Sequence, residues 1–212
     1  MKLYKFLSAE FAIKTLTERQ IKASRISDLN DSFDFFGVVF ASEKENIVWE
    51  NFIDRRGRHV SNPICICCFS RRFDSPLMWA HYGDSGKGIV LEFEVEAEGC
   101  LPVEYRSTRI VSSSISQMSH EHKIELVKLA FSVKSTDWQY EDEVRFIVAI
   151  DQELGQQPLV FVPFSKSLEL TRVMIGPKSE VSRSKIEGLV DSSVYVKRMR
   201  KSRTEFSIEI SD

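Results

Sequence analysis

The sequence of 212 residues has neither a long apolar run nor a strong charge imbalance. Its longest apolar stretch, FFGVVFA at residues 35–41, is far shorter than the roughly 20 residues that a membrane-spanning helix needs. The opening residues MKLYKFLSAEF lack the apolar segment of a secretory signal. The formal net charge of -2 gives no general attraction to nucleic acid or to a membrane. We therefore expect a soluble, cytoplasmic protein with no membrane partner.

Short motifs that commonly bind nucleotides or metal ions are also missing. Neither G-x-G-x-x-G nor G-x-x-x-x-G-K-[ST] occurs. The stretch GDSGKG at residues 83–88 lacks the phosphate-loop spacing and precedes a predicted strand where a helix is required, so we interpret it as a turn. His120 and His122 lie two residues apart on a predicted helix and point about 200° apart, so they do not form a chelating pair.

Cysteine is scarce: there are four, and three of them fall in ICICCFS at residues 64–70. In an extended chain Cys65 and Cys67 face one side and Cys68 faces the other, which leaves Cys100 as the remote thiol. A zinc site usually needs two separated pairs of ligands. We therefore expect buried, reduced thiols and no metal site.

The residues that are present fit a single α+β domain spanning 1–212. Apolar residues make up 42% and aromatic residues 11% of the chain, which is a globular composition. Periodic patterns predict helices at residues 8–20, 75–83, 119–134 and 182–190, and in the second half of 37–55. They predict strands at 2–7, 21–27, 62–70, 87–95, 143–150, 159–164, 170–176, 193–199 and 205–210. Because the second half is rich in strands, we expect mostly antiparallel sheets with flanking helices.

The stretch DWQYEDEVRFIVAI, at residues 137–150, places three consecutive acids before a predicted strand. In an extended segment Glu141 and Glu143 point to one side and Asp142 to the other. Two carboxylates at this spacing raise one pKa, which suits acid–base chemistry. Alternatively, Glu141, Glu143 and Arg145 form a surface row of ion pairs. In either case we interpret Trp138 and Tyr140 as core aromatics.

Other chemically distinctive stretches have simple structural interpretations. His81, in MWAHYG at residues 78–83, has no Asp or Ser in a triad-like arrangement, and a lone His is commonly a hydrogen-bonded structural residue. The basic runs RRGRH at 55–59 and KRMRKSR at 197–203 are typical of a solvated loop and a solvated strand.

Several stretches, in this order, resemble the bacterial family known as domain of unknown function 2971. They are LYKF (3–6), SDLNDSF (27–33), CFS (68–70), MWAHYGDSGKGIVLEF (78–93), VEY (103–105), Lys134 with WQYEDEVRF (138–146), and VMIGP (173–177). The resemblance extends over nearly the whole chain. The family usually has Pro and Glu in an Asn-Asp-Pro-Phe-Glu segment, where this chain has Ser32 and Asp34.

A strand followed by a helix at the start, and a late Glu-x-Glu leading into a strand, also resemble ADP-ribosyltransferases. This resemblance implies two packed, mostly antiparallel sheets and NAD as the substrate. It implies that a residue of the first strand helps to hold NAD, that a Ser or Tyr strand lies in the cleft, and that a late Glu is catalytic. Lys5 is a departure, because it stands where many such enzymes have His or Arg.

The same resemblance implies roles for individual residues. Cleavage of the nicotinamide–ribose bond creates an oxocarbenium-like ribose, as in glycoside hydrolysis. Glu143 is then expected to bind the ribose 2′-OH and stabilise the cation, and Glu141 to act as general base on the acceptor. The cofactor-binding candidates are Ser70, Trp79 and Tyr82 at the nicotinamide, Lys5 and Arg145 near the phosphates, and His81. Each has a structural alternative: Ser70 as a cap or turn residue, Trp79 and Tyr82 as core aromatics, Arg145 as an ion-pair partner.

Three functions follow from these patterns. The first is an NAD-consuming effector of the toxin or phage-defence type that modifies a nucleic acid or a protein. The second is a non-catalytic sensor or interaction domain of a defence or regulatory system that uses MWAHYG and the basic 197–203 stretch. The third is a metal-dependent nuclease built on Asp31, Asp34 and Glu143. The patterns assign no acceptor, oligomeric state or role for Asn30. Convergence of Lys5, Ser70, Tyr82 and Glu143 on one cleft would support the first.

Overall fold

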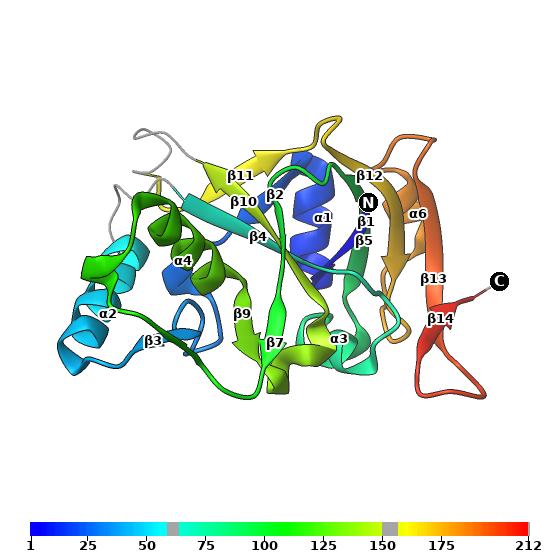
Figure 1. Cartoon of the computed structure of the whole chain (residues 1–212). Helices are drawn as coiled ribbons and strands as arrows, with labels where there is room; N and C mark the ends of the chain where they lie inside the picture. Colours follow the sequence, from blue (N-terminus) through cyan, green and yellow to red (C-terminus); the bar gives the residue numbers. More distant parts are fainter. Residues whose placement is uncertain (59–63, 150–156, 212) are drawn as a thin grey trace.

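A large, mostly antiparallel sheet runs through the molecule and carries helices on both faces (Figure 1). The computed structural model describes residues 1–58, 64–149 and 157–211. Its combination of helices with antiparallel sheets confirms the predicted α+β class. Across these described ranges, no helix combines the length and the apolar character needed to cross a membrane.

The main sheet has eight strands. Their order is β14 (Ile208–Ile210), β13 (Tyr195–Lys201), β12 (Leu168–Ile175), β5 (Ile89–Val95), β1 (Lys2–Leu7), β4 (Ile64–Ser70), β10 (Glu143–Ala149) and β6 (Cys100–Pro102). Neighbouring strands are antiparallel except β12 and β13, which are parallel.

Three two-stranded sheets accompany the main sheet. They pair β11 (Val160–Pro163) with β2 (Gln20–Ala23), β3 (Val38–Phe40) with β8 (Ile110–Ser112), and β7 (Glu104–Arg106) with β9 (Val133–Ser135). The strands β3, β6, β7, β8 and β9 are three residues long and were not predicted. So short a strand is defined by a distant partner and not by a local pattern.

The helices are α1 (Ala9–Glu18), α2 (Glu43–Arg58), α3 (Pro76–His81), α4 (His120–Ser132) and α6 (Arg183–Glu187), as predicted. Serine side chains cap four of them by accepting a backbone N–H of the first turn: Ser8 for α1, Ser75 for α3, Ser119 for α4 and Ser182 for α6. Such a cap is worth about 1 kcal/mol. GDSGKG forms a 3-10 turn at Asp84–Gly86, as predicted.

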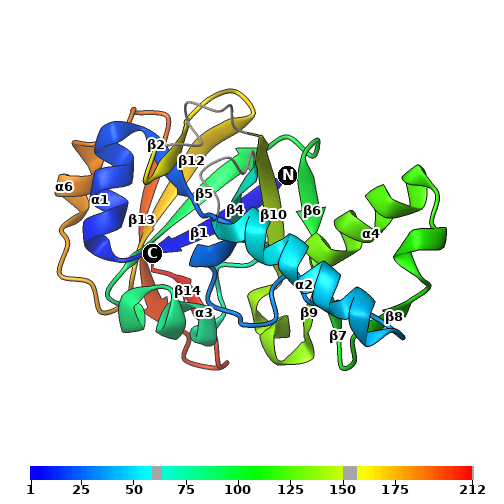
Figure 2. The same ribbon diagram turned by 90° about the vertical axis from the view of Figure 1, so that its left-hand side faces the viewer.

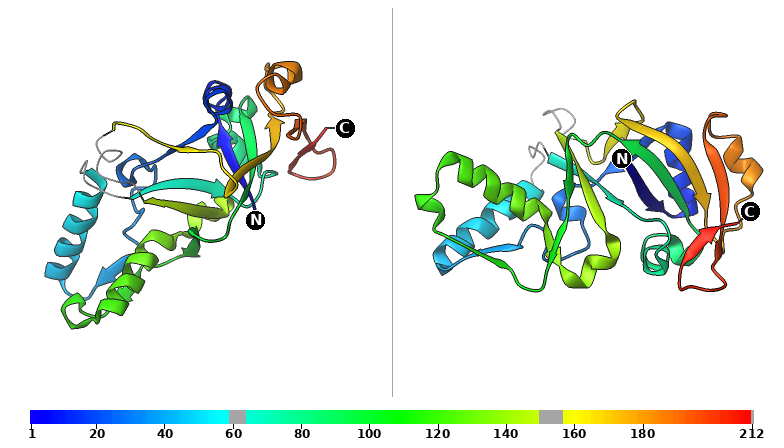
Figure 3. Two further views of the ribbon diagram at one scale, coloured as in Figure 1. Left: turned by 90° about the horizontal axis from the view of Figure 1, so that it is seen from above. Right: turned by 45° about the vertical axis from the view of Figure 1, so that its right-hand side comes forward.

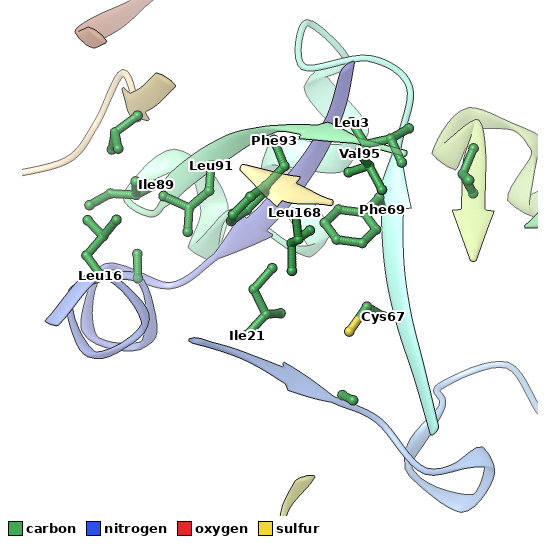
Figure 4. Close-up of a cluster of buried hydrophobic side chains, with 14 of the residues drawn as sticks. Leu3, Leu16, Ile21, Cys67, Phe69, Ile89, Leu91, Phe93, Val95 and Leu168 are labelled. Atoms are coloured by element: carbon green, nitrogen blue, oxygen red, sulfur yellow. The ribbon is translucent and has the colours of Figure 1, made fainter. Parts of the chain in front are cut away.

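The largest core lies between the main sheet and the elements that cover one face (Figure 4). Inward residues of β5, from Ile89 to Val95, meet Leu16 of α1, Ile21 of β2 and Ile186 of α6. The alternation predicted for this strand is therefore correct. The opposite face of β5 is also buried, because Val90 packs with α3 in a separate cluster. The strand thus lies in the interior of the molecule on both sides.

The helices α2 and α4 lie together at the end of the molecule opposite β13 and β14 (Figures 1 and 3). Their apolar residues, including Trp49, Ile53, Leu126 and Phe131, pack with Ile66 of β4. Figure 2 shows α1 and α6 next to each other, at the side of the molecule away from α4. The central strands therefore separate a helical end from a sheet-rich end.

The main sheet is nearly interrupted between β1 and β4. Strand β1 pairs with β5 along its whole length, and β4 pairs with β10 from Ser70–Glu143 to Ile64–Ala149. Between β1 and β4, however, the described residues are in register only at Tyr4 and Ser70. We call this junction the seam. Because the two strands diverge beyond the Tyr4–Ser70 pair, side chains of both line the space between them.

Candidate functional site

A cavity of about 280 Å³ occupies the seam. It is bounded by β1, β4, the end of α3 with Tyr82, the loop from Ser24 to Asp34, β9 and the acids before β10. Its volume is close to the lower end of the roughly 300–1,000 Å³ typical of ligand pockets. Four widely separated predicted residues, Lys5, Ser70, Tyr82 and Glu143, all line it, and so does Glu141. The convergence expected of a cleft is therefore present.

The two glutamates reach the cavity by a route that the sequence did not predict. Residues Thr136–Glu141 form a 3-10 helix, and Asp142 then adopts a left-handed conformation with φ of 44°. Glu143 begins β10. The prediction of one extended segment was therefore wrong for Glu141 and Asp142. The turn nevertheless leaves both glutamates on the cavity, while Asp142 pairs with Arg71 at the surface.

A buried lysine joins the two carboxylates. Lys134 of β9 places Nζ 2.6 Å from Glu141 Oε2 and 3.4 Å from Glu143 Oε2. All three residues are at most 5% exposed. The alternative of a solvated surface row is therefore wrong. Because burial strongly penalises an isolated charge, each of these groups depends on the others to remain ionised.

Arg145 completes this ion network on the side away from the cavity. It is fully buried, and its Nε donates to Glu143 Oε1 at 2.9 Å. Its Nη1 donates to the carbonyl of Phe131 at 3.1 Å, and its Nη2 pairs with Asp34. Asp34 thus supplies the carboxylate where the resembling family usually has Glu. The predicted neutralisation of Glu143 by Arg145 is present. Arg145 does not line the cavity, which gives its predicted phosphate contact no geometric support.

The two glutamates differ in their acidity. Burial raises the pKa of Glu141 above its usual value, and Lys134 and the Tyr82 hydrogen bond only partly offset this. Burial also acts to raise the pKa of Glu143, but Arg145 and Lys134 outweigh it and leave this pKa below the usual value. The site therefore combines a carboxylate held ionised with one that accepts a proton more readily, as acid–base chemistry requires.

Tyr82 links Glu141 to the loop on the other side of the cavity. Its hydroxyl donates to Glu141 Oε1 at 2.5 Å and accepts from Asn30 Nδ2 at 2.8 Å. Burial and the neighbouring Glu141 raise the pKa of Tyr82. The bridge from Asn30 through Tyr82 to Glu141 therefore spans three separate segments of the chain. Asn30, to which the sequence assigned no role, contributes to the wall of the cavity.

Ser70 and Lys5 lie on the two strands of the seam. The Ser70 hydroxyl donates to the carbonyl of Glu141 at 2.6 Å, and it stands in register between Tyr4 and Glu143. Lys5 extends across the gap and donates to the carbonyl of Cys68 at 3.0 Å. Ser70 thus holds the turn that carries Glu141, and Lys5 places a cation at the cavity wall.

Besides Arg145, two further predicted cofactor-binding residues lie outside the cavity. Trp79 is a core aromatic, 2% exposed, whose Nε1 donates to the carbonyl of Phe73. His81 is exposed on α3, and its Nδ1 lies 2.9 Å from the hydroxyl of Tyr140. Neither lines the cavity. Trp138 and Tyr140, expected in the core, are only half-buried because they belong to the 3-10 helix at the surface.

Lys134 is the residue of the network that the sequence did not single out as a site residue, and Asp34 was considered only for a metal-dependent nuclease site. Lys134 precedes Glu141 by seven positions and has no local partner in the sequence. Its occurrence among the family-like stretches was the only available signal. Asp34 lies in the loop that departs from the family pattern. In the fold, each becomes the counter-charge of a buried ion.

The cysteines, histidines and basic runs contribute little to this site. Within 1–58, 64–149 and 157–211, no three His, Cys, Asp or Glu side chains form a group arranged to hold a metal ion. The four cysteines are free thiols; Cys65 and Cys67 are buried as expected, whereas Cys68 and Cys100 are only half-buried. In the 197–203 run, Arg198 donates to the carbonyls of Ser179 and Val181, and Arg200 pairs with Glu209. The side chains of the 55–59 run lie outside the described residues.

Comparison with known proteins supports the resemblance found in the sequence. Residues 78–146, about a third of the chain, match the family described as "Protein of unknown function (DUF2971)". This segment contains α3 from Met78 onward, Lys134, both glutamates and Arg145, and so covers most of the cavity wall formed by α3, β9 and β10. No curated protein and no solved structure matches the chain.

Proposed function

We propose that the seam cavity binds NAD and that the protein cleaves the nicotinamide–ribose bond, transferring ADP-ribose to an acceptor. The proposal rests on one observation: Lys5, Ser70, Tyr82, Glu141 and Glu143 converge on a single cavity between diverging strands. These residues come from β1, β4, the end of α3 and the turn into β10. Polar and titratable side chains that converge on one pocket from several segments are typical of an active site.

The charge of the cavity suits the proposed reaction. Three buried carboxylates, Asp34, Glu141 and Glu143, face two buried cations, Lys134 and Arg145. The network therefore carries a net negative charge when all five groups are ionised. The nicotinamide ring of NAD is cationic, and the positive charge moves to the ribose as the bond breaks. A fixed negative charge stabilises that cation more strongly in a buried site than in water.

In the proposed step, the bond between ribose C1′ and the nicotinamide nitrogen breaks, and its electron pair leaves with neutral nicotinamide. Glu143, whose pKa is lowered, remains ionised and stabilises the oxocarbenium-like ribose. An acceptor hydroxyl or amine then bonds to C1′, and its proton passes to Glu141, whose pKa is raised. With water as the acceptor, the products are nicotinamide and ADP-ribose.

The test compares three variants that each remove one carboxylate charge from consecutive positions. Purified protein is incubated with NAD carrying a label on the adenylate phosphate, with and without cell extract, and released nicotinamide and transferred label are measured. We expect wild type to be active, and Glu143→Gln to lose at least about a hundredfold of the rate, because one electrostatic contact to the transition state supplies about 10²–10³. Glu141→Gln should lower the rate of label transfer more than it lowers the rate of nicotinamide release.

Asp142→Asn is the matched control, because Asp142 lies between the two glutamates but pairs with Arg71 outside the cavity. It should retain wild-type rates. Each variant is also checked for its unfolding midpoint, so that loss of fold is separated from loss of chemistry. A wild-type protein that neither releases nicotinamide nor transfers label under any of these conditions would refute the proposal. A non-catalytic sensor domain would then be the remaining interpretation.

A further inference from the structure

A second concave surface lies outside the seam cavity, on the turn that joins β13 to β14. This groove of about 430 Å³ is formed by residues 201–208, which we call the hairpin loop, together with Pro76 at the start of α3. Phe206 in the hairpin loop is fully exposed, and no other large apolar side chain of the described residues is as accessible. A phenyl ring left in solvent at the rim of a groove has lost the stabilisation that burial would provide.

The hairpin loop also carries positive charge without internal partners. Arg198 and Arg200, on the preceding strand, are engaged with backbone carbonyls and with Glu209. Lys201 and Arg203, by contrast, have no ion pair among the residues that the structure describes, and both are exposed. Glu205 is the one acid of the hairpin loop, so the loop has a positive net charge. An exposed aromatic ring and two unpaired cations on the same groove form an arrangement that can stack a base and contact phosphates.

The position of the hairpin loop connects it with the seam cavity. Its base is fixed to the segment just before α3, because the Ile208 N–H donates to the carbonyl of Asp74 at 2.9 Å. Ile208 also packs in the same apolar cluster as Tyr4 and as Met78 of α3. Tyr4 and Met78 also line the seam cavity. Figures 1 and 2 both show the hairpin loop beside α3. Helix α3 connects the two surfaces: Pro76 lines the groove, while Met78 and Tyr82 line the cavity, and Pro76 and Tyr82 are about 9 Å apart along the helix at about 1.5 Å per residue.

We propose that the hairpin loop binds a single-stranded nucleic acid, stacking one base on Phe206 and contacting phosphates through Lys201 and Arg203, and that it presents this strand as the acceptor of the seam cavity. The presentation of an acceptor rests on the proposed transferase function. The binding does not, because it needs neither NAD nor turnover. A duplex offers no free base face to Phe206, so unpaired strands are preferred.

The test measures fluorescence anisotropy of labelled 12-nucleotide single strands of mixed sequence, one DNA and one RNA, titrated with the full-length protein at several salt concentrations. Phe206→Ala should weaken binding about tenfold, since stacking of one base is worth about 1–3 kcal/mol. The double variant Lys201→Ala/Arg203→Ala should reduce the salt slope of binding by about 1.4, because each phosphate contact to a single strand contributes about 0.7. The DNA and RNA arms decide which sugar is preferred.

Matched controls carry the same chemical changes on distant surfaces. Phe11→Ala removes an exposed ring from α1, and Lys123→Ala/Lys128→Ala removes two exposed charges from α4. Neither should alter binding, and Glu143→Gln should bind like wild type even though it is expected to be inactive. Failure of both strands to bind at about 50 mM salt, or equal losses of affinity in the hairpin and control variants, would overturn the proposal. Transfer of label to proteins alone, without strand binding, would also overturn it and leave the transferase proposal intact.

Discussion

Glu143 and Glu141 offer a paired test of the buried ion network, because the same substitution should have different effects at two positions that are two residues apart. The pKa of Glu143 lies below its usual value in the folded protein, and that of Glu141 lies above it. Ionised Glu143 therefore stabilises the fold, whereas ionised Glu141 costs part of what its contacts contribute. Replacing each with Gln removes the charge and keeps the shape.

The expected magnitudes follow from the remaining contacts. In Glu143→Gln, Arg145 keeps only Asp34 and Lys134 keeps only Glu141 as carboxylate partners. Loss of one partner from a buried ion pair costs about 3–5 kcal/mol, and we expect about 3 kcal/mol because both cations retain one carboxylate. In Glu141→Gln, Lys134 retains Glu143, but the single amide oxygen can accept from only one of Tyr82 and Lys134. Because burial already disfavours the charge of Glu141, we expect a smaller loss, of about 1–2 kcal/mol.

The measurement is urea unfolding of the wild type and both variants at neutral and acidic pH, with Asp142→Asn as the exposed control. The stabilisation from Glu143 is present above its unfolded pKa of about 4.3 and is lost as the pH falls through its lower folded pKa. The gap between wild type and Glu143→Gln should therefore narrow only in acid. Equal destabilisation by both variants, or a larger loss in Glu141→Gln, would contradict the network as described.

Further outcomes follow from other buried groups. Gly88→Ala should lower the free energy of unfolding by about 1–3 kcal/mol, because the new Cβ would lie 2.2 Å from the carbonyl oxygen of Leu7. Gly188→Ala, whose Cβ would have its nearest neighbour at 3.6 Å, should leave the free energy of unfolding nearly unchanged. Lys134→Met should cost about 3–5 kcal/mol in urea unfolding, while Lys128→Met, on an exposed face of α4, should cost almost nothing; similar losses would argue against a buried counter-ion. Burial raises the pKa of the Cys65 and Cys67 thiols, so iodoacetamide at neutral pH should modify these two residues slowly in the native protein and fully in urea; fast native labelling of either, located by peptide mass spectrometry, would contradict their burial.

Much of the fold could be predicted because its local signals agree. A serine precedes α1, α3, α4 and α6, and the side chain of each caps its helix. The long strands of the main sheet follow their apolar alternation or apolar runs. The three-residue strands carry no such pattern, since two or three residues show no period. Pairing between segments such as β7 and β9, about thirty residues apart, is decided by tertiary packing.

The sequence indicated part of the cavity lining, but it also indicated Trp79, His81 and Arg145, which do not line the cavity. The family-like stretches and the ADP-ribosyltransferase resemblance indicated Lys5, Ser70, Tyr82 and Glu143, and these do line one cavity. The left-handed Asp142 was not predictable, because Asp tolerates this conformation without requiring it. Lys134 was missed for another reason: a single lysine has no sequence pattern that reveals which buried acids it will meet.

The seam between β1 and β4 has a consequence for motion. A continuous ladder of hydrogen bonds resists bending, but here the described residues of the two strands are in register at one pair only, Tyr4 and Ser70. The sheet therefore consists of two stiff halves joined at a narrow point, and the cavity lies where they meet. A small rotation of one half would widen or narrow the cavity while leaving both cores intact. We expect backbone amides within β5 and β10 to exchange slowly with solvent and those flanking the seam to exchange much faster.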